Sequence, residues 1–370
     1  MDRTPSTPLS RAAAFANRLG IQVPILLAPM AGACPASLSI AVANAGGMGA
    51  CGALLMNSDS IRSWADGFRN ASNGQFQMNL WIRDPTPVRD LELERRQREF
   101  LGAWGPPVTS EMGDAVLPDF DEQLNTILDI RPKAISSIMG LYSPSAVSEI
   151  KARNILWFAT ATTVAEARAA EAAGADVIVA QGMEAGGHRG SFQADQAENN
   201  MVGLMALLPQ VVDAVSIPVV ATGGISDPRG VAAALILGAS AVQIGTGFLR
   251  CPEAKTHPAY ADQLARTEAH DTTVTRAFSG RPGRGVANRF VHAAAAPGSP
   301  PSAPYPVQRG FTRPMREEAV KTGDTDRMQM WAGQSAKLAQ NKPAGEIVHT
   351  LWQATQNLLS TAWVEKERLA

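Results

Sequence analysis

The residues with the clearest chemical potential lie in a glycine-rich stretch near the middle of the chain. Residues 177–180 (VIVA) are apolar, as in a strand buried on both faces, and four of the next ten residues are glycine. Glycine at this density allows positive φ angles and a close approach of the backbone to a flat or phosphorylated ligand. His188 lies among these glycines and can move a proton near neutral pH. The pattern predicts a strand that ends at a catalytic or binding site.

Three other polar residues belong to the same stretch. Gln181 ends the strand, where it can hydrogen-bond a ligand, whereas Glu184 and Arg189 are interpreted as residues that shape the loop. For an isolated loop, a solvent-exposed turn with solvated charges would be the simpler interpretation. Two further strand-then-glycine units follow this one, and they favour a site.

These two later units predict a phosphate-binding position. One apolar segment leads into Gly223 and Gly224, and the next leads into Gly245 and Thr246. In a parallel barrel the loops after the last two strands commonly bind phosphate, because backbone N–H groups and a helix N-terminus face the anion. Each charge-assisted hydrogen bond contributes roughly 1.5–3 kcal/mol, so a few of them could hold a phosphate without a lysine. The alternative is that these glycines only permit tight turns.

The elements that position these residues alternate between apolar and helical segments, which is the pattern of a parallel sheet. We predict strands at residues 25–28, 48–52, 75–80, 134–139, 155–160, 177–180, 217–225 and 241–247. We predict helices at residues 35–45, 58–68, 121–129, 145–152, 164–173, 201–215 and 226–238. Eight such units predict a (β/α)8 TIM barrel of the α/β class over residues 1–253, with a doubly wound sheet as the less favoured arrangement.

Two segments fall outside this repeat. Residues 84–118, after the third strand, contain a charged helix at 91–100 and exceed an ordinary βα loop, so we expect an insertion over the barrel mouth or at a subunit contact. Residues 254–370 are expected to form a mainly helical C-terminal extension that packs on the barrel and completes the active-site region. Its predicted helices cover about 315–340 and 344–368. The apolar side of the last helix would consist of Ile347, Leu351, Trp352, Leu358 and Leu359.

The composition of the chain limits the classes of binding partner and the location that we expect. A formal net charge of -1 gives no field for nucleic acid or an anionic membrane, so a small molecule is the expected partner. No segment approaches the roughly 18 apolar residues of a membrane span. Three cysteines without paired spacing favour a reduced, cytoplasmic location. Residues 11–18 are expected to form a short helix, with a mitochondrial presequence as the alternative interpretation. A homo-oligomer is compatible with the apolar faces of the insertion and the extension.

A phosphate beyond the last two strands leaves the centre of the barrel mouth for a flat group. The strand ends there offer amide and carbonyl groups and an apolar shelf, which suit the edge of a planar ring. No lysine at these ends indicates a Schiff base, and no carboxylate cluster indicates a metal. Flavin mononucleotide (FMN) fits this pattern. The ring-lining residues would be Ala28, Pro29, Met30, Asn79, Gln181, Gly186 and Gly187, with Gly223, Gly224, Gly245 and Thr246 at the phosphate.

Several motifs, in their order and spacing, resemble those of the nitronate monooxygenase family, formerly called 2-nitropropane dioxygenases. The motifs are PILLAPMAG (24–32), QGMEAGGHRG (181–190), ATGGI (221–225), QIGT (243–246), SGRPGRGVANRF (279–290) and WAGQSA (331–336). The resemblance implies FMN as the cofactor and His188 as the active-site histidine. The FMN contacts that it implies are Asn79, Gln181, Gly186, Gly224, Gln243, Ile244, Gly245 and Thr246.

The family resemblance also implies a reaction. Alkyl nitronates such as propionate 3-nitronate would be oxidised by O₂ to a carbonyl compound and nitrite, without NAD(P)H. His188 would stabilise the anionic nitronate or deprotonate a neutral nitroalkane. The insertion and the long extension fall where substrate pockets are often shaped, so the resemblance leaves the substrate's identity open.

On sequence grounds two other functions remain open and a third is disfavoured. An NADH-dependent FMN enoyl reductase of fatty acid synthesis has the same barrel and needs no separate dinucleotide motif. A protein of the IMP dehydrogenase type is disfavoured, because the loop after the sixth strand has no nucleophilic cysteine. From another class, the chain could be a non-redox phosphate-binding barrel protein, acting on a sugar phosphate or only binding its ligand.

Overall fold

Eight parallel strands close into a barrel, which confirms the predicted (β/α)8 fold. The computed structural model describes the backbone of residues 7–368 and the side chains of residues 7–360, so the prediction for residues 1–6 lies outside the described residues. Neighbouring strands follow chain order around the barrel, and the last strand pairs with the first. The barrel strands are β1 (Ile25–Leu27), β2 (Met48–Gly52), β3 (Gln75–Trp81), β4 (Ala134–Ile138), β5 (Leu156–Ala161), β6 (Val177–Gln181), β8 (Val219–Thr222) and β9 (Ala241–Ile244).

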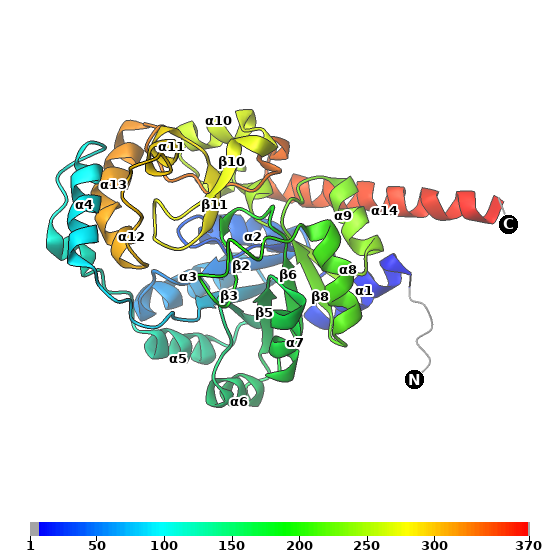
Figure 1. Ribbon diagram of the computed structural model, residues 1–370. Helices are drawn as coiled ribbons and strands as arrows, with labels where there is room; N and C mark the ends of the chain where they lie inside the picture. The colour runs from blue at the N-terminus through cyan, green and yellow to red at the C-terminus, as the bar shows by residue number, and fades with distance from the viewer. Residues whose placement is uncertain (1–6, 369–370) are drawn as a thin grey trace.

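Helices surround the barrel at the positions that the sequence predicted (Figure 1). Several of them begin at a polar N-cap residue, as at Ser143 and Asp227, whose side chains accept hydrogen bonds from backbone N–H groups of the first turn. The C-terminal helix α14 (Ala344–Arg368) packs against α9 and α2 and extends beyond the barrel (Figure 1). The other barrel helices are α2 (Ala36–Asn44), α3 (Ser58–Ala71), α5 (Phe120–Ile130), α6 (Pro144–Ala152), α7 (Val164–Ala172), α8 (Leu204–Ala214) and α9 (Pro228–Ile236).

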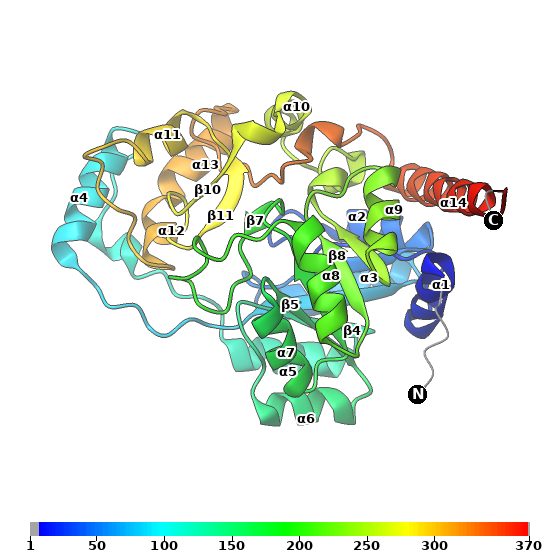
Figure 2. The same ribbon diagram turned by 45° about the vertical axis from the view of Figure 1, so that its right-hand side comes forward.

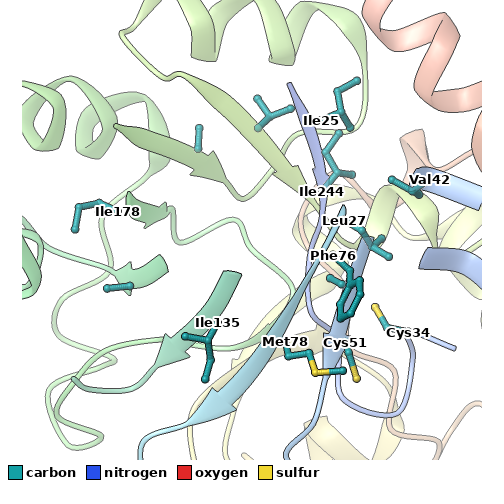
Figure 3. Packing of buried hydrophobic residues seen from close by; sticks show 14 of the residues in the cluster. Ile25, Leu27, Cys34, Val42, Cys51, Phe76, Met78, Ile135, Ile178 and Ile244 are labelled. Atoms are coloured by element: carbon teal, nitrogen blue, oxygen red, sulfur yellow. The ribbon is translucent and has the colours of Figure 1, made fainter. Parts of the chain in front are cut away.

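Alternation along the strands produces two apolar layers. Ile25 and Leu27 face the surrounding helices, whereas Leu26 between them faces the barrel interior. Figure 3 shows the packed outer layer. Helix α1 (Pro8–Leu19) buries Phe15 and Leu19 in the same cluster as Leu26, so it covers the amino-terminal end of the barrel. The opposite end, where the strands finish, is left for the site.

The insertion after β3 packs against the C-terminal extension. It contains α4 (Leu91–Gly102) and a 3₁₀ turn, η1 (Ser110–Gly113). Leu101 of α4 shares an apolar cluster with Phe278, Phe290 and Phe311 of the extension, and Figure 1 shows α4 beside α12 and α13. Residues 84–118 support the extension and do not line the main cavity, and the expectation that they lie over the barrel mouth or at a subunit contact stays a prediction.

The extension also adds a small second sheet that the sequence did not reveal. Its antiparallel order is β10-β11-β7, and β7 (Gly187–His188) comes from the barrel loop after β6. His188 pairs with Gly283 of β11, and Figure 2 shows β7 between the barrel and β11. The predicted loop position of His188 is therefore corrected to a short strand. The remaining elements are η2 (Thr246–Phe248), η3 (Pro252–Ala254), α10 (Pro258–Arg266), η4 (Ala269–Asp271), β10 (Thr272–Thr275), β11 (Gly283–Val286), α11 (Arg289–Ala294), α12 (Val307–Phe311), α13 (Arg313–Thr322) and η5 (Ala336–Leu338).

Two predictions for the extension need correction. The predicted helix at 315–340 ends at Thr322, because Gly323 adopts a φ of +69° and caps α13; residues 323–335 are largely irregular. On α14, Ile347, Leu351 and Leu359 are buried as predicted, but the Leu358 side chain is 43% exposed. Within the described residues, no helix has the length and apolar character needed to cross a membrane.

Candidate active site

A cavity of about 400 Å³ lies where the barrel strands end. Its volume falls in the range of small-molecule and cofactor sites. Residues of the C-terminal extension complete its wall, including Tyr305, Arg309 and Trp331. Nearly all of the predicted site residues line it, namely Ala28, Pro29, Met30, Asn79, Gln181, Gly186, Gly187, His188, Gly223, Gly224, Gln243, Gly245 and Thr246.

Ile244 is the predicted contact that the structure does not bring to the cavity. Its side chain is 2% exposed and packs in the outer apolar layer, next to Ile25 and Leu27 in Figure 3. Successive strand residues point to opposite faces, so Ile244 faces the helices when Gln243 faces the interior. Its carbonyl oxygen accepts a hydrogen bond from the Ala28 N–H at 2.9 Å. The side chain of Ile244 therefore has a structural role.

His188 is held by contacts from both the barrel and the extension. Its Nε2 lies 2.8 Å from the Ser279 hydroxyl oxygen. The imidazole packs between two indoles, with ring centroids 4.7 Å from Trp81 and 4.9 Å from Trp331. Gln181 fixes the backbone by donating to the His188 carbonyl at 3.2 Å. The ring is therefore preorganised at the cavity wall.

The surroundings keep this imidazole uncharged. Burial lowers the pKa of His188 to about 3, and the positive charges of Arg281 and Arg309 act in the same direction. Nδ1 makes no hydrogen bond to any residue that the structure describes, which leaves it available to a ligand. His188 is thus a neutral donor or acceptor at neutral pH and a weak base.

The other polar residues of the glycine-rich stretch organise its shape. Glu184 accepts hydrogen bonds from the Leu204 N–H, at 2.9 and 3.0 Å, at the start of α8. Arg189 is 4% exposed and donates to backbone carbonyls, including that of Gln181 at 2.6 Å. The Gln181 side chain also accepts from the Gly190 N–H at 2.8 Å. These contacts agree with the expectation that Glu184 and Arg189 shape the loop.

The glycine turns after β8 and β9 also line the cavity. Gly223 and Gly224 have φ angles of +114° and +69°, a region that disfavours other residues. Thr246 Oγ1 accepts a hydrogen bond from the Gly333 N–H at 3.0 Å, so the extension contacts the turn after β9. At the start of α9, the Asp227 side chain accepts a hydrogen bond from Gly230 N–H at 3.0 Å, so one amide of this helix N-terminus is already bonded. The phosphate position at these turns stays a prediction.

Several cavity residues were not singled out from the sequence. Trp81 could have been found, because it lies two residues after Asn79 on β3 and must share its face. Ser279 and Trp331 lie in motifs that the resemblance included without a role. Tyr305 and Arg309 carry no local signal, since only the folding of the extension back onto the barrel places them at the cavity.

Fold and site together define a (β/α)8-barrel protein whose strand-end cavity joins glycine turns to a preorganised, neutral histidine. A model of the family described as nitronate monooxygenase matches residues 13–354. The chain is 37% identical over 341 residues to a probable nitronate monooxygenase of Staphylococcus aureus (strain Newman), covering 90% of this chain and 94% of that one. The chain therefore belongs to the nitronate monooxygenase family, a family of oxidoreductases, which confirms the resemblance.

Two solved structures show the same likeness in three dimensions. A nitroalkane oxidase from Streptomyces ansochromogenes is 34% identical, with a TM-score of 0.85, and the match covers 95% of this chain and 99% of that one. FabK from Thermotoga maritima is 28% identical, with a TM-score of 0.73, and the match covers 96% and 98%. The extension is therefore shared with these proteins along with the barrel.

Proposed function

We propose that the cavity binds FMN and that the protein oxidises alkyl nitronates, such as propionate 3-nitronate, with O₂ to a carbonyl compound and nitrite, without NAD(P)H. The observation that supports this most is that one cavity is lined both by the glycine turns after β8 and β9 and by neutral His188. The family membership of the chain and its nitroalkane oxidase neighbour point the same way.

The residues present fit FMN. Gly223 and Gly224 keep the turn after β8 free of side chains, and a Cβ on Gly245 would stand 3.2 Å from Met30 Sδ. The phosphate would be held by the turn amides after β8 and β9. The ring would contact the residues after β1 and the Asn79 and Gln181 side chains. When bound, FMN would accept the electrons of the nitronate and pass them to O₂.

His188 would act on the substrate as a hydrogen-bond donor. A general base works best with a pKa near the operating pH, and a pKa of about 3 makes His188 a poor base for a neutral nitroalkane. A nitronate already carries its negative charge and needs only a donor. The donating form of His188 would be the neutral tautomer that carries its proton on Nδ1, with the Ser279 hydroxyl donating to Nε2. We therefore favour the nitronate anion over the neutral nitroalkane as the substrate.

The structural likeness to FabK keeps an NADH-dependent FMN enoyl reductase as the second candidate. The two functions differ in the reductant of the flavin. Purified protein should be yellow and release FMN in a 1:1 ratio when denatured. With propionate 3-nitronate it should consume O₂ and release nitrite in the absence of NADH. Colourless protein after reconstitution with FMN, or turnover that depends on NADH, would contradict the proposal.

A further inference from the structure

The cavity carries an imbalance of charge. Two arginines, Arg309 of α12 and Arg316 of α13, line it, and no aspartate or glutamate among the described residues does so. Other buried arginines nearby have partners: Arg281 pairs with Asp84, and Arg284 donates to the Met183 carbonyl at 2.8 Å. A cation that is desolvated without a counter-charge is costly, so such a site favours an anionic ligand.

Of the two arginines, Arg309 has the guanidinium without a partner among the described residues. Its guanidinium makes no hydrogen bond or ion pair within the part of the chain that the structure describes, and burial lowers its pKa. Arg316 stands behind it and is held by neutral partners: it donates to Thr312 Oγ1 at 3.1 Å, to Gln329 Oε1 at 3.2 Å and to the Arg309 carbonyl at 3.0 Å. Arg316 therefore supports the local positive potential without neutralising it.

Tyr305 supplies a second, independent observation. Its side chain lines the cavity, and its buried hydroxyl oxygen has no hydrogen-bond partner among the residues that the structure describes. Burial raises the pKa of Tyr305 to about 12, so the hydroxyl keeps its proton and can donate it. A buried hydroxyl without a partner costs about 1–3 kcal/mol, which a ligand acceptor would recover. Tyr305 and Arg309 also interact electrostatically, which places the two groups near one another.

The position of Tyr305 and Arg309 relative to His188 indicates which anion the two residues would bind. Tyr305 packs on Trp81, with ring centroids 5.6 Å apart, and Trp81 packs on His188. The charge of Arg309 reaches His188, since it contributes to lowering the pKa of that residue. The glycine turns proposed for the cofactor phosphate lie instead after β8 and β9. Tyr305 and Arg309 thus lie near His188, the residue proposed to act on the substrate.

We propose that Tyr305 and Arg309, supported by Arg316, form a subsite for a carboxylate on the substrate, so that the protein selects carboxylate-bearing nitronates over neutral alkyl nitronates. This inference rests on the proposed function. A guanidinium can bind a carboxylate through two parallel hydrogen bonds, and the Tyr305 hydroxyl can add a third. Arg309 and Tyr305 are then specificity-determining residues of the reaction.

The test compares two nitronates with the same three-carbon chain, those of 3-nitropropionate and of 1-nitropropane, in anaerobic flavin reduction. In Arg309→Gln we expect the ratio of their second-order rate constants to fall by about 10- to 100-fold, the usual weight of hydrogen bonds to a charged group. In Arg309→Lys, which keeps the charge, this ratio should fall by less. Arg313→Gln is the matched control, because it removes an arginine on the neighbouring helix that is 62% exposed, and its ratio should match wild type.

Binding of succinate, an unreactive dianion, gives a readout independent of turnover. Calorimetry should detect succinate binding to the FMN-loaded wild type and to Arg313→Gln, and at least about 10-fold weaker binding to Arg309→Gln and Tyr305→Phe. An unchanged substrate ratio with unchanged succinate binding would overturn the subsite. Loss of FMN from Arg309→Gln would overturn it in favour of a cofactor contact. If neither nitronate reduces the wild-type flavin, the proposed function fails, while succinate binding still decides the subsite.

Discussion

The His188 Nε2 and the Ser279 hydroxyl oxygen are 2.8 Å apart, and this contact joins the barrel to the extension at the site. The two residues are far apart in sequence and meet because β7 pairs with β11. The hydroxyl has one proton and two acceptors within reach, His188 Nε2 and the Arg281 carbonyl at 3.1 Å. Its choice between them sets whether His188 Nδ1 faces the ligand as a donor or as an acceptor.

Replacing His188 tests its role directly. His188→Asn should retain FMN, because the proposed cofactor contacts lie elsewhere, yet slow anaerobic flavin reduction. Removing one preorganised donor typically costs about 2.7–4 kcal/mol, or roughly 10²–10³ in rate. Stopped-flow absorbance of the flavin measures the rate, with FMN content as the control. An unchanged rate would remove His188 from the reaction.

Replacing Ser279 should have a smaller effect. Ser279→Ala removes the partner of Nε2 and frees the imidazole to change tautomer, at a cost of about 0.5–1.5 kcal/mol, up to roughly 10-fold in rate. Nitrogen NMR of the histidine ring should show a shift of the proton from Nδ1 towards Nε2. Wild-type tautomer populations in the variant would show that Ser279 does not orient the ring.

The pH dependence of stability follows from the neutral imidazole. Between about pH 6.5 and 3, His188 binds a proton in the unfolded chain but not in the folded one. The contribution of His188 to the free energy of unfolding is complete above pH 6.5. It is lost as the pH falls, by up to about 1.4 kcal/mol per pH unit. Urea unfolding from pH 7.5 to 5 should therefore show a shallower loss for His188→Asn than for wild type. Replacement of the exposed His270 should not change the curve, and parallel curves for all three proteins would contradict the prediction.

The ion pair between Asp84 and Arg281 should stabilise the closed arrangement of insertion and extension. The Arg281 side chain is 1% exposed and that of Asp84 is 26% exposed. Asp84→Asn would leave a buried guanidinium without its counter-charge and should destabilise the protein by about 3 kcal/mol. Asp114→Asn is the matched control, since Asp114 is 66% exposed in its pair with Arg89 and should cost less than about 1 kcal/mol. Equal losses of unfolding free energy in the two variants would show that burial does not set the strength of the Asp84–Arg281 pair.

Gly224 tests the turn after β8. Gly224→Ala forces alanine into a φ of +69° and should destabilise the fold by about 1–2 kcal/mol. Gly298→Ala, at an exposed position with a φ of +87° and open space around the added Cβ, imposes similar backbone strain away from the cavity. FMN retention during gel filtration should fall only for Gly224→Ala. Equal retention in both variants would argue against a cofactor contact at this turn.

The barrel could be predicted from the sequence because its signals are local. Most strands are short, largely apolar runs, and helix starts such as Ser143 and Asp227 carry their own caps. Most cavity residues could be predicted for the same reason, since glycines and polar side chains directly follow those strands.

The remainder of the site depends on contacts between distant segments. Arg309 and Tyr305 reach the cavity only because the extension folds over it, supported by Leu101 of the insertion. The end of α13 at Gly323 was missed because the sequence beyond it retains helix-forming residues, while the φ of +69° at this glycine interrupts the helix. Ile244 is a cofactor contact only by the family resemblance of the QIGT motif, and strand alternation turns its side chain away from the cavity.

Anaerobic reduction of the purified protein's flavin distinguishes nitronate oxidation from NADH-dependent reduction. Propionate 3-nitronate should bleach the yellow protein without NADH, NADH alone should not, and admitted air should restore the colour. Bleaching by NADH with no response to the nitronate would contradict nitronate oxidation and assign the site to a reductase.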